Sequence, residues 1–290
     1  MSYNGAISLK KGDASNKVSR VALGSVRMIL LLAVAFIMVL PFVWMLSSSL
    51  KYDKEIFTYP TKWIPEVFRW ANYQEVWTRI SFPTFYLNTI KLAAIITAGQ
   101  LLTCSLAAYA FAKLNFPGRD KLFLGYLGTM MIPWHAIMIP QFIIIKTLGL
   151  YGTHWSLILL QVFSVFGVFL LRQFMLSIPM ELSQAARIDG CNEFGIYSKI
   201  ILPLSKPGLA TLTVFTFNFI WNDYLGPLIY LSEERLKTIQ LGLTYFKSIY
   251  KMEYGLIMAG TVSSLLPIII IYAFAQRYLI EGIAFSGLKG

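Results

Sequence analysis

The sequence predicts an all-α membrane protein with six transmembrane helices and a two-helix polar insert between the fourth and fifth. Of its 290 residues, 57% are hydrophobic and only 13% are charged, and the mean hydropathy is +0.62. A soluble domain of this composition would expose large apolar patches, which favour aggregation. The apolar residues are also gathered into runs close to the roughly twenty residues that cross a hydrocarbon core.

Six such runs follow one another along the chain. Five of them contain no Asp, Glu, Lys or Arg, and these cover residues 28–50, 92–112, 122–145, 147–171 and 254–276. The remaining run, 207–222, is shorter but extends past Asp223 to Tyr230. Within the third run, Pro133 and Pro140 each remove a backbone donor and clash with the preceding turn. We therefore expect the third span to be bent or locally opened.

The segment before the first run predicts the orientation. Residues 1–22 form a polar tail, and the basic residues ahead of the apolar run are Lys10, Lys11, Lys17, Arg20 and Arg27. The run is too long for the apolar region of a signal peptide, and no A-x-A-like cleavage site ends it. The first span is therefore predicted to be uncleaved, with a cytoplasmic N-terminal tail ahead of a membrane domain of residues 23–290. Six spans then place the C-terminus in the cytoplasm too, and a small excess of Lys and Arg on that side agrees.

Composition and motifs exclude several classes of function. The formal net charge of +11 comes from basic residues spread through the segments between spans, which fits lipid headgroups rather than nucleic acid. Cys104 lies in a span and Cys191 in the insert, so they give no disulfide framework. The sequence has no metal-ligand spacing and no Ser/His/Asp set, and the glycine-spaced stretch 255–262 lacks the lysine of a phosphate-binding loop. We therefore expect no enzyme activity and no cofactor in this chain, and an energy source elsewhere.

The polar insert, residues 177–207, carries signals for two short helices. Pro179 suits the first turn of a helix, and Gly190 suits the left-handed residue that ends it. Asn192 is a natural N-cap for a second helix, and Pro203 is expected to end that helix. The apolar face of the second helix is predicted to comprise Phe194, Tyr197 and Ile201.

The first of these helices has the features of a protein-docking surface. Ala185 and Ala186 are expected on its exposed face, where small side chains let another protein approach closely. Arg187 and Asp189 would provide directional polar contacts at the rim. An amphipathic loop lying on the lipid headgroups is the alternative that the composition allows.

The insert resembles the cytoplasmic loop of binding-protein-dependent ABC importer permeases. The motif of that loop reads E-A-A, three residues, Gly, nine residues, then I-x-L-P, and the matching positions here are Gln184, Ala185, Ala186, Gly190, Ile200, Leu202 and Pro203. One departure is that Gln184 stands where the family usually has Glu. A neutral amide keeps the size and the hydrogen bonding of Glu but loses its charge.

The rest of the chain is similar to the maltose-transporter-type carbohydrate permeases. The similarity is carried by "MIPWHAIMIPQFIIIKTLGLYGT", "IPMELSQAARIDG" and "FIWNDYLGPLIY". It implies a core transmembrane domain of about residues 84–277, in the bacterial plasma membrane, with the insert as the coupling loop that fits a cleft in an ATPase subunit. It also implies the partners: a second homologous permease subunit, two copies of a cytoplasmic ATPase subunit that use ATP and Mg, and an extracytoplasmic sugar-binding protein.

A sugar site is expected at the outer part of the fifth span. Carbohydrates are recognised by aromatic faces and by neutral or acidic hydrogen-bonding groups, which suits Trp221, Asn222, Asp223 and Tyr224. An interfacial anchor at a helix end is the alternative for these residues. The sequence leaves the sugar open, from a monosaccharide to an acidic glycan.

Two other classes of function compete with an ATP-driven importer. An ion-coupled secondary transporter should show inverted repeats and ionisable groups at the membrane midplane, and neither is evident in the sequence. A scaffold or an intramembrane enzyme is the third class, and the catalytic residues of such an enzyme are absent from the sequence. The sequence therefore favours a permease subunit of an importer for a sugar or oligosaccharide.

Overall fold

The computed structural model describes the backbone of residues 6–247 and 252–287, and the side chains of residues 23–247 and 252–277. Over these residues the regular structure is helical, apart from one isolated bridge between Lys247 and Met252. Four segments are long and apolar enough to cross a membrane: Leu23–Ser49, Phe82–Lys113, His154–Ser177 and Tyr254–Arg277. Two bent helix pairs raise this number to six if each pair is one span. The all-helical membrane class is thus confirmed, and the count of six stays a prediction.

The chain divides into two compact units. The first consists of Met1–Asn72 and Tyr254–Val262, and the second of Tyr73–Glu253 and Ser263–Gly290. In chain order the helices are α1 (Ala6–Ser49), α2 (Asp53–Ile56), α3 (Ala71–Arg79), α4 (Phe82–Lys113), α5 (Arg119–Gly128), η1 (Thr129–Met131), α6 (Trp134–Thr147), α7 (His154–Gln161), α8 (Val165–Ser177), α9 (Met180–Ile188), α10 (Glu193–Ile196), the π-helix η2 (Tyr197–Ile201), α11 (Leu202–Leu204), α12 (Lys206–Trp221), α13 (Leu225–Tyr230), η3 (Glu234–Leu236), α14 (Ile239–Leu243), η4 (Thr244–Phe246) and α15 (Tyr254–Gly287).

In the first unit, buried polar contacts hold the end of α1 against the start of α15. The side-chain amide of Asn72 donates to the carbonyl oxygens of Ser49 and Lys51, both at 2.9 Å. The Asp53 carboxylate accepts from the backbone N–H of Gly255 at 2.8 Å. Helix α1 begins at Ala6 and continues across the predicted boundary between residues 22 and 23, and residues 1–5 of the predicted tail lie outside the described residues.

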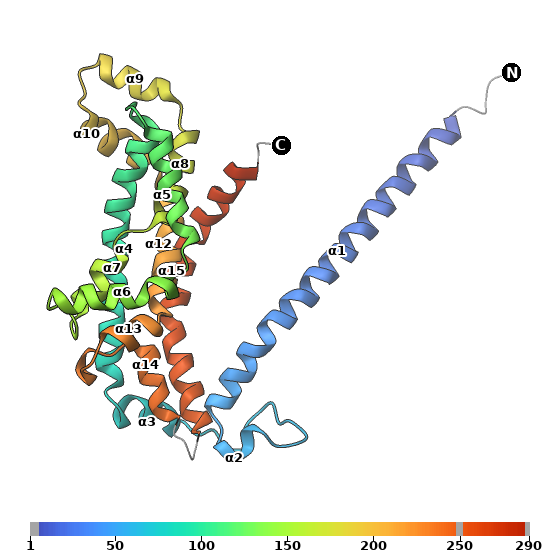
Figure 1. The fold of residues 1–290 in the computed structure, drawn as a ribbon. Coiled ribbons are helices and arrows are strands. Elements are labelled where there is room, and N and C mark those ends of the chain that lie inside the picture. The colour runs from blue at the N-terminus through green and yellow to red at the C-terminus, as the bar shows by residue number, and fades with distance from the viewer. Residues whose placement is uncertain (1–5, 248–251, 288–290) are drawn as a thin grey trace. The chain divides into compact units, whose positions relative to one another are not determined.

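In the second unit, α4 is the central element. It runs along the length of the unit and packs against α8 and α12 (Figure 1). One buried apolar cluster joins these three helices to α5 and to the insert, and its members include Ala108, Phe123, Leu171, Ile196 and Leu212. The insert is therefore part of the same core as the long helices.

The third predicted span is sharply bent, as the prolines indicate. The segment Arg119–Met131 and helix α6 meet at 96°, and the break falls at Ile132 and Pro133. Pro133 is the N-cap of α6, where a missing N–H costs no helical hydrogen bond. Pro140 lies inside α6 without ending it.

The fourth predicted span is interrupted between α7 and α8. Residues 162–164 lie outside both helices, so carbonyl groups near the break lack their normal helical partners. Side chains of α4 donate to three carbonyl oxygens here: Gln100 to Gln161 O at 2.6 Å, Thr103 to Val162 O at 2.6 Å, and Cys104 at 3.4 Å to Ser164 O, which also accepts from Val168 N at 3.0 Å. An irregular backbone deep in the bundle is thus compatible with a membrane because its polar groups are bonded internally.

Candidate functional site

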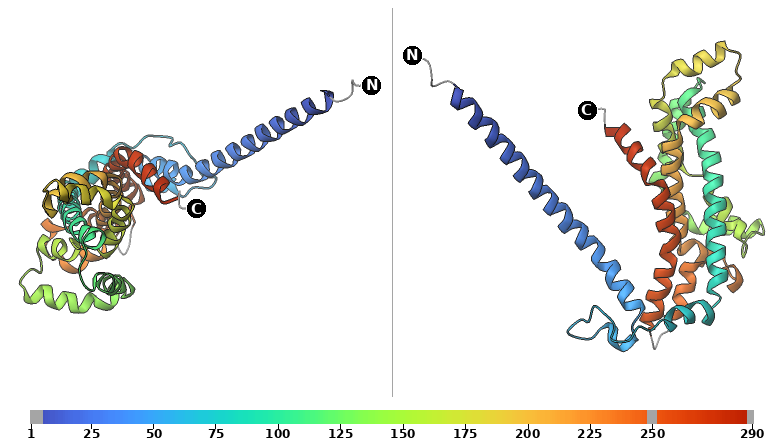
Figure 2. Two further views of the ribbon diagram at one scale, coloured as in Figure 1. Left: turned by 90° about the horizontal axis from the view of Figure 1, so that it is seen from above. Right: turned by 180° about the vertical axis from the view of Figure 1, so that it is seen from behind.

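The insert folds into an arch at one end of the second unit. Figure 1 shows α9 beyond the ends of α4 and α8 and α10 beside the end of α4, and Figure 2 shows the same arch from behind. Gly190 has φ +81° and stops α9, and the Asn192 side chain accepts from Gly195 N at 2.7 Å and caps α10. Both of these predictions are confirmed. The prediction for Pro203 is wrong, because it lies within α11, in a first turn that follows the π-helix and does not require its N–H.

One of the two alanines faces the bundle rather than the outside. Ala185 is exposed, but Ala186 is only 6% exposed and packs in the core cluster with Ile196, Tyr197 and Ile201. Ser183, three residues earlier on the same helix face, is buried as well. The small side chain of Ala186 therefore lets α9 approach the bundle, and the prediction that it faces a partner is corrected.

The outward side of the arch carries apolar side chains. Ile188 is 87% exposed and Phe194 is 70% exposed, and Leu182 is partly exposed. The predicted apolar face of Phe194, Tyr197 and Ile201 is divided, because Tyr197 and Ile201 are buried in the core whereas Phe194 points away from it. Gln184 and Asp189 are also exposed, whereas Ile200 and Leu202 are half-buried at the base of the arch.

The predicted rim residue Arg187 is engaged within the chain. Its Nε donates to Glu193 Oε1 at 2.7 Å, and the other carboxylate oxygen of Glu193 accepts from the hydroxyl of Tyr109 at 2.6 Å. The Arg187 guanidinium and then the Tyr109 hydroxyl hold the pKa of Glu193 below its usual value. Sequence reasoning missed this role of Glu193, because Tyr109 is 84 residues away and no spacing rule pairs 187 with 193 across a left-handed turn.

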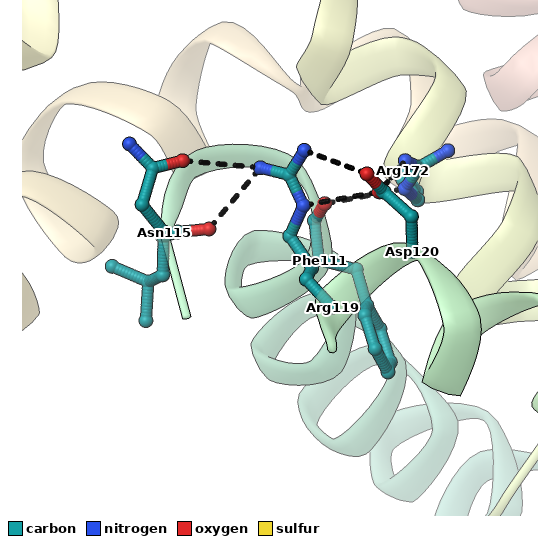
Figure 3. A network of polar contacts seen from close by, with 6 residues as sticks. Phe111, Asn115, Arg119, Asp120 and Arg172 are labelled. Carbon is teal, nitrogen blue, oxygen red and sulfur yellow. Dashed lines mark hydrogen bonds and ion pairs between the residues drawn. The ribbon is translucent and has the colours of Figure 1, made fainter. Parts of the chain in front are cut away.

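A second polar network fixes the helix ends beside the arch (Figure 3). Arg172 of α8 donates from Nε to the Phe111 carbonyl oxygen of α4 at 3.2 Å and lies 3.5 Å from an oxygen of Asp120 in α5. Its guanidinium also stands over the Phe123 ring, 4.1 Å from the centroid. Arg119 pairs with the same carboxylate at 3.1 Å. One half-buried arginine thus holds α4, α5 and α8 together at this end.

A cavity of about 1000 Å³ opens in the second unit, where the break between α7 and α8 faces the junction of α12 and α13. Aromatic residues form much of its wall: Trp134, Phe163, Phe166, Phe215, Phe219, Tyr224 and Tyr230. Its polar wall consists mainly of Gln100, Gln141, Gln161, Asn218, Asn222 and Asp223. Apolar surface with a few placed polar groups is typical of a small-molecule site.

Asp223 joins two helix ends across this cavity. One carboxylate oxygen accepts from Gln161 Nε2 at 2.9 Å, at the end of α7, and the other accepts from Gly226 N at 3.0 Å, at the start of α13. Gly226 is needed there, because a Cβ at this position would lie 2.5 Å from the Asp223 carboxylate. Both donors are neutral, and Asp223 is the one acidic residue of the cavity wall within the described residues.

The structure separates the four predicted sugar-contacting residues. Asn222, Asp223 and Tyr224 line the cavity, but Trp221 is fully buried, and its indole N–H donates to Ser264 O at 3.0 Å. The prediction for Trp221 is therefore corrected, because one helical step of about 100° turns it from the cavity into the core, against Tyr86.

Two further polar atoms at the cavity were missed from the sequence. The Tyr230 hydroxyl and Gln161 Oε1 are buried and have no hydrogen-bond partner among the described residues. A buried polar atom without a partner is costly, so such atoms mark a place for water or a polar ligand.

Comparisons with known proteins agree with this architecture. Residues 100–284 match the family described as binding-protein-dependent transport system inner membrane component. The chain is 34% identical over 260 residues to the arabinooligosaccharides transport system permease protein AraQ of Halalkalibacterium halodurans, covering 89% of this chain and 93% of that one. It is 33% identical to the lactose transport system permease protein LacG of Rhizobium radiobacter, covering 86% and 90%. Among solved structures, a bacterial ABC transporter involved in the import of the acidic polysaccharide alginate superposes with a TM-score of 0.80 and 26% identity, covering 90% of this chain and 98% of that chain.

Proposed function

This chain belongs to the family of binding-protein-dependent transport system inner membrane components, and from that premise we propose that it is one of two permease subunits of an ATP-driven sugar importer. The relatives are named as transport permeases and not as enzymes, so the chain is a membrane component without catalytic residues of its own. ATP and Mg act in two copies of a cytoplasmic ATPase subunit, and an extracytoplasmic binding protein delivers the sugar.

The observation that carries the proposal is the arch. Its outward side presents Ile188 and Phe194 to the surroundings, while its inward side is built into the core through Ala186. Apolar side chains held on a polar, rigid support are suited to a protein interface. In this proposal the insert lies in the cytoplasm and docks on an ATPase subunit, the bent pair of Arg119–Met131 and α6 forms the third span, and α12 begins the fifth span.

The second part of the proposal concerns the pathway. Unpartnered polar atoms of Gln161 and Tyr230, together with Asn222 and Asp223, suit the hydroxyl groups of a carbohydrate, which both donate and accept hydrogen bonds. Tyr224 and the other aromatic residues supply faces for the apolar side of a sugar ring. This cavity would form half of the pathway, and the second permease subunit the other half.

The mechanism follows from differential contact with two states. Closure of the ATPase subunits would displace the arch, and the displacement would tilt α4, α8 and α12, which share one core with it. ATP can drive the change only because the ATPase contacts the arch differently in the inward-open and outward-open states.

Native cysteines provide a direct test of the orientation. Cys191 is exposed on the arch, and Cys104 is buried in the core. A membrane-impermeant maleimide should label Cys191 in inside-out vesicles and not in right-side-out vesicles, and the Cys191→Ser variant should remain unlabelled in both. Labelling from the outer side would contradict the proposal.

Energy coupling requires a second experiment. The complex, purified with the ATPase and second permease that co-purify with this chain, is reconstituted with its binding protein and given lactose, diacetylchitobiose or arabino-oligosaccharides. Uptake should require ATP and persist with ionophores. Uptake that ionophores abolish would instead indicate an ion-coupled secondary transporter.

A further inference from the structure

Glu193 bonds to two elements at once. Arg187 of α9 donates to Oε1 at 2.7 Å, and Tyr109 of α4 donates to Oε2 at 2.6 Å. Each oxygen of the carboxylate therefore serves a different helix, while Glu193 itself lies in the first turn of α10. Hydrogen bonds between ionised groups, and to an ionised carboxylate, are about twice as strong as neutral ones.

The α4 end of this bridge is firmly held. Tyr109 is buried in the core cluster, and its ring meets the Tyr197 ring edge-on at 5.4 Å between centroids. The hydroxyl of Tyr197 is in turn within 2.7 Å of Ser105 Oγ, one turn earlier on α4. The π-helix and α10 are thus fixed to α4 by packing and by a buried hydrogen bond.

The α9 end of the bridge adjoins a tight turn, which is closed by backbone hydrogen bonds from Gly190 N to Arg187 O at 3.1 Å and from Cys191 N to Ala186 O at 2.9 Å. Helix α9 is joined to α10 through the left-handed Gly190, and no heavy atom lies within 4 Å of a Cβ built at this glycine. Backbone rotation at such a glycine meets little steric resistance. The Arg187–Glu193 pair spans this turn and so restrains the angle between the two helices.

We propose that Glu193 is a positioning residue for transport: its bridge makes α9 move together with α4, so that rotation at Gly190 does not absorb the displacement of the arch. This inference rests on the proposed function, because it assigns a role within that coupling. Glu193 need not touch the ATPase or the sugar. Because both side chains of the Arg187–Glu193 pair are partly exposed, we expect the pair to shift the equilibrium between a restrained and a free α9 by about two- to fivefold.

The first experiment measures the arch in the purified full-length chain, without any sugar. A nitroxide on native Cys191 reports the mobility of the turn, and Cys191→Ser gives the background signal. Glu193→Gln removes the charge with little change in size, and Tyr109→Phe removes one hydroxyl while keeping the ring. Both variants should make the nitroxide more mobile, and Tyr126→Phe should not, since its ring stacks on Phe111 near the same cluster and its hydroxyl has no partner among the described residues. Unchanged spectra for both Glu193→Gln and Tyr109→Phe would overturn the proposal.

The second experiment measures coupling in the reconstituted complex, with lactose, diacetylchitobiose and arabino-oligosaccharides as sugars. In Glu193→Gln and Tyr109→Phe, the ATP hydrolysed per sugar imported should rise by about twofold or more, while ATPase activity is retained. If Glu193→Gln does not assemble, Tyr109→Phe decides the question. Wild-type complex that fails to couple ATP to uptake would contradict the proposed function itself. Normal coupling in wild type and in both variants would contradict only the role of Glu193.

Discussion

The arch and the cavity each contain one hydrogen-bonded acid, but the two acids have different partners. Glu193 is paired with a guanidinium, whereas Asp223 is held by a side-chain amide and a backbone N–H. The opposite charges of Arg187 and Glu193 compensate each other, and their contact restrains the turn between α9 and α10. The acid at the cavity has only neutral hydrogen-bond donors, and Gln161 and Tyr230, which also line the cavity, each have a buried polar atom without a hydrogen-bond partner among the described residues. The contacts of the arch therefore favour a fixed conformation, whereas the polar atoms at the cavity wall suit a polar ligand.

The largest effect on the folded state is expected from Gly226→Ala. The new Cβ would lie 2.5 Å from the Asp223 carboxylate, so the bond that begins α13 must break or shift. Overpacking of this kind costs about 1–3 kcal/mol, which thermal unfolding in detergent would detect. Gly125→Ala is the matched control, because nothing lies within 4 Å of its Cβ and Ala favours a helix. Equal stability of the two variants would show that the cavity wall is not held in this way.

A change at the turn of the arch should affect transport rather than insertion. Gly190→Asp places a side chain at φ +81°, at a cost of about 1 kcal/mol or more, and adds a charge beside Asp189. We expect ATP-driven uptake to fall about tenfold while the amount of protein in the membrane is maintained. Gly190→Asn carries a similar backbone strain without the charge, so the difference between the two variants isolates the electrostatic part. Full uptake by both would argue against a rigid arch.

Neutralising the cavity acid should have a moderate effect. Asp223→Asn keeps the shape and one acceptor oxygen, but replaces the carboxyl group by an amide. The apparent affinity for sugar in proteoliposomes should fall about three- to tenfold, the size of one hydrogen bond. Glu234→Gln, an exposed acid in η3, should leave the affinity unchanged. An unaltered affinity in Asp223→Asn would remove this residue from the sugar site.

The smallest effect concerns pH. The pKa of Glu193 is lowered in the folded protein, chiefly by Arg187, so its contribution is fully present above the unfolded value of 4.5 and is lost as the pH falls through the folded value. Nitroxide mobility at Cys191 should thus be constant from pH 8 to about pH 5 and should increase only at lower pH. In Glu193→Gln this increase should be absent. Because both side chains are partly exposed, salt should weaken the effect.

Features that depend on local chemistry were predictable from the sequence. The apolar runs indicated the long helices, Pro133 indicated the bend, and Gly190 and Asn192 indicated the turn and the cap. Each of these is decided within a few residues of the chain. The spans themselves are found because charge is excluded from them.

Features that depend on tertiary packing were not predictable. The inward face of Ala186 and the burial of Trp221 are set by neighbours on α4, α8 and α15 rather than by local pattern. The exposure of Phe194 follows from the position of α10 in the arch. The bond between Tyr109 and Glu193 links two segments 84 residues apart. Such contacts follow no spacing rule in one sequence.

The interruption between α7 and α8 at residues 162–164 connects the cavity to the arch through α4. The carbonyl oxygens of residues 161, 162 and 164 accept hydrogen bonds from Gln100, Thr103 and Cys104 of α4, and α4 also bonds to the arch through Tyr109. In the proposed importer, a sugar that displaces the cavity wall would therefore also displace α4, the helix that holds the arch. Thermodynamic linkage then requires reciprocity: if binding of the ATPase subunits changes the affinity for sugar by some factor, binding of sugar must change the affinity for the ATPase subunits by the same factor.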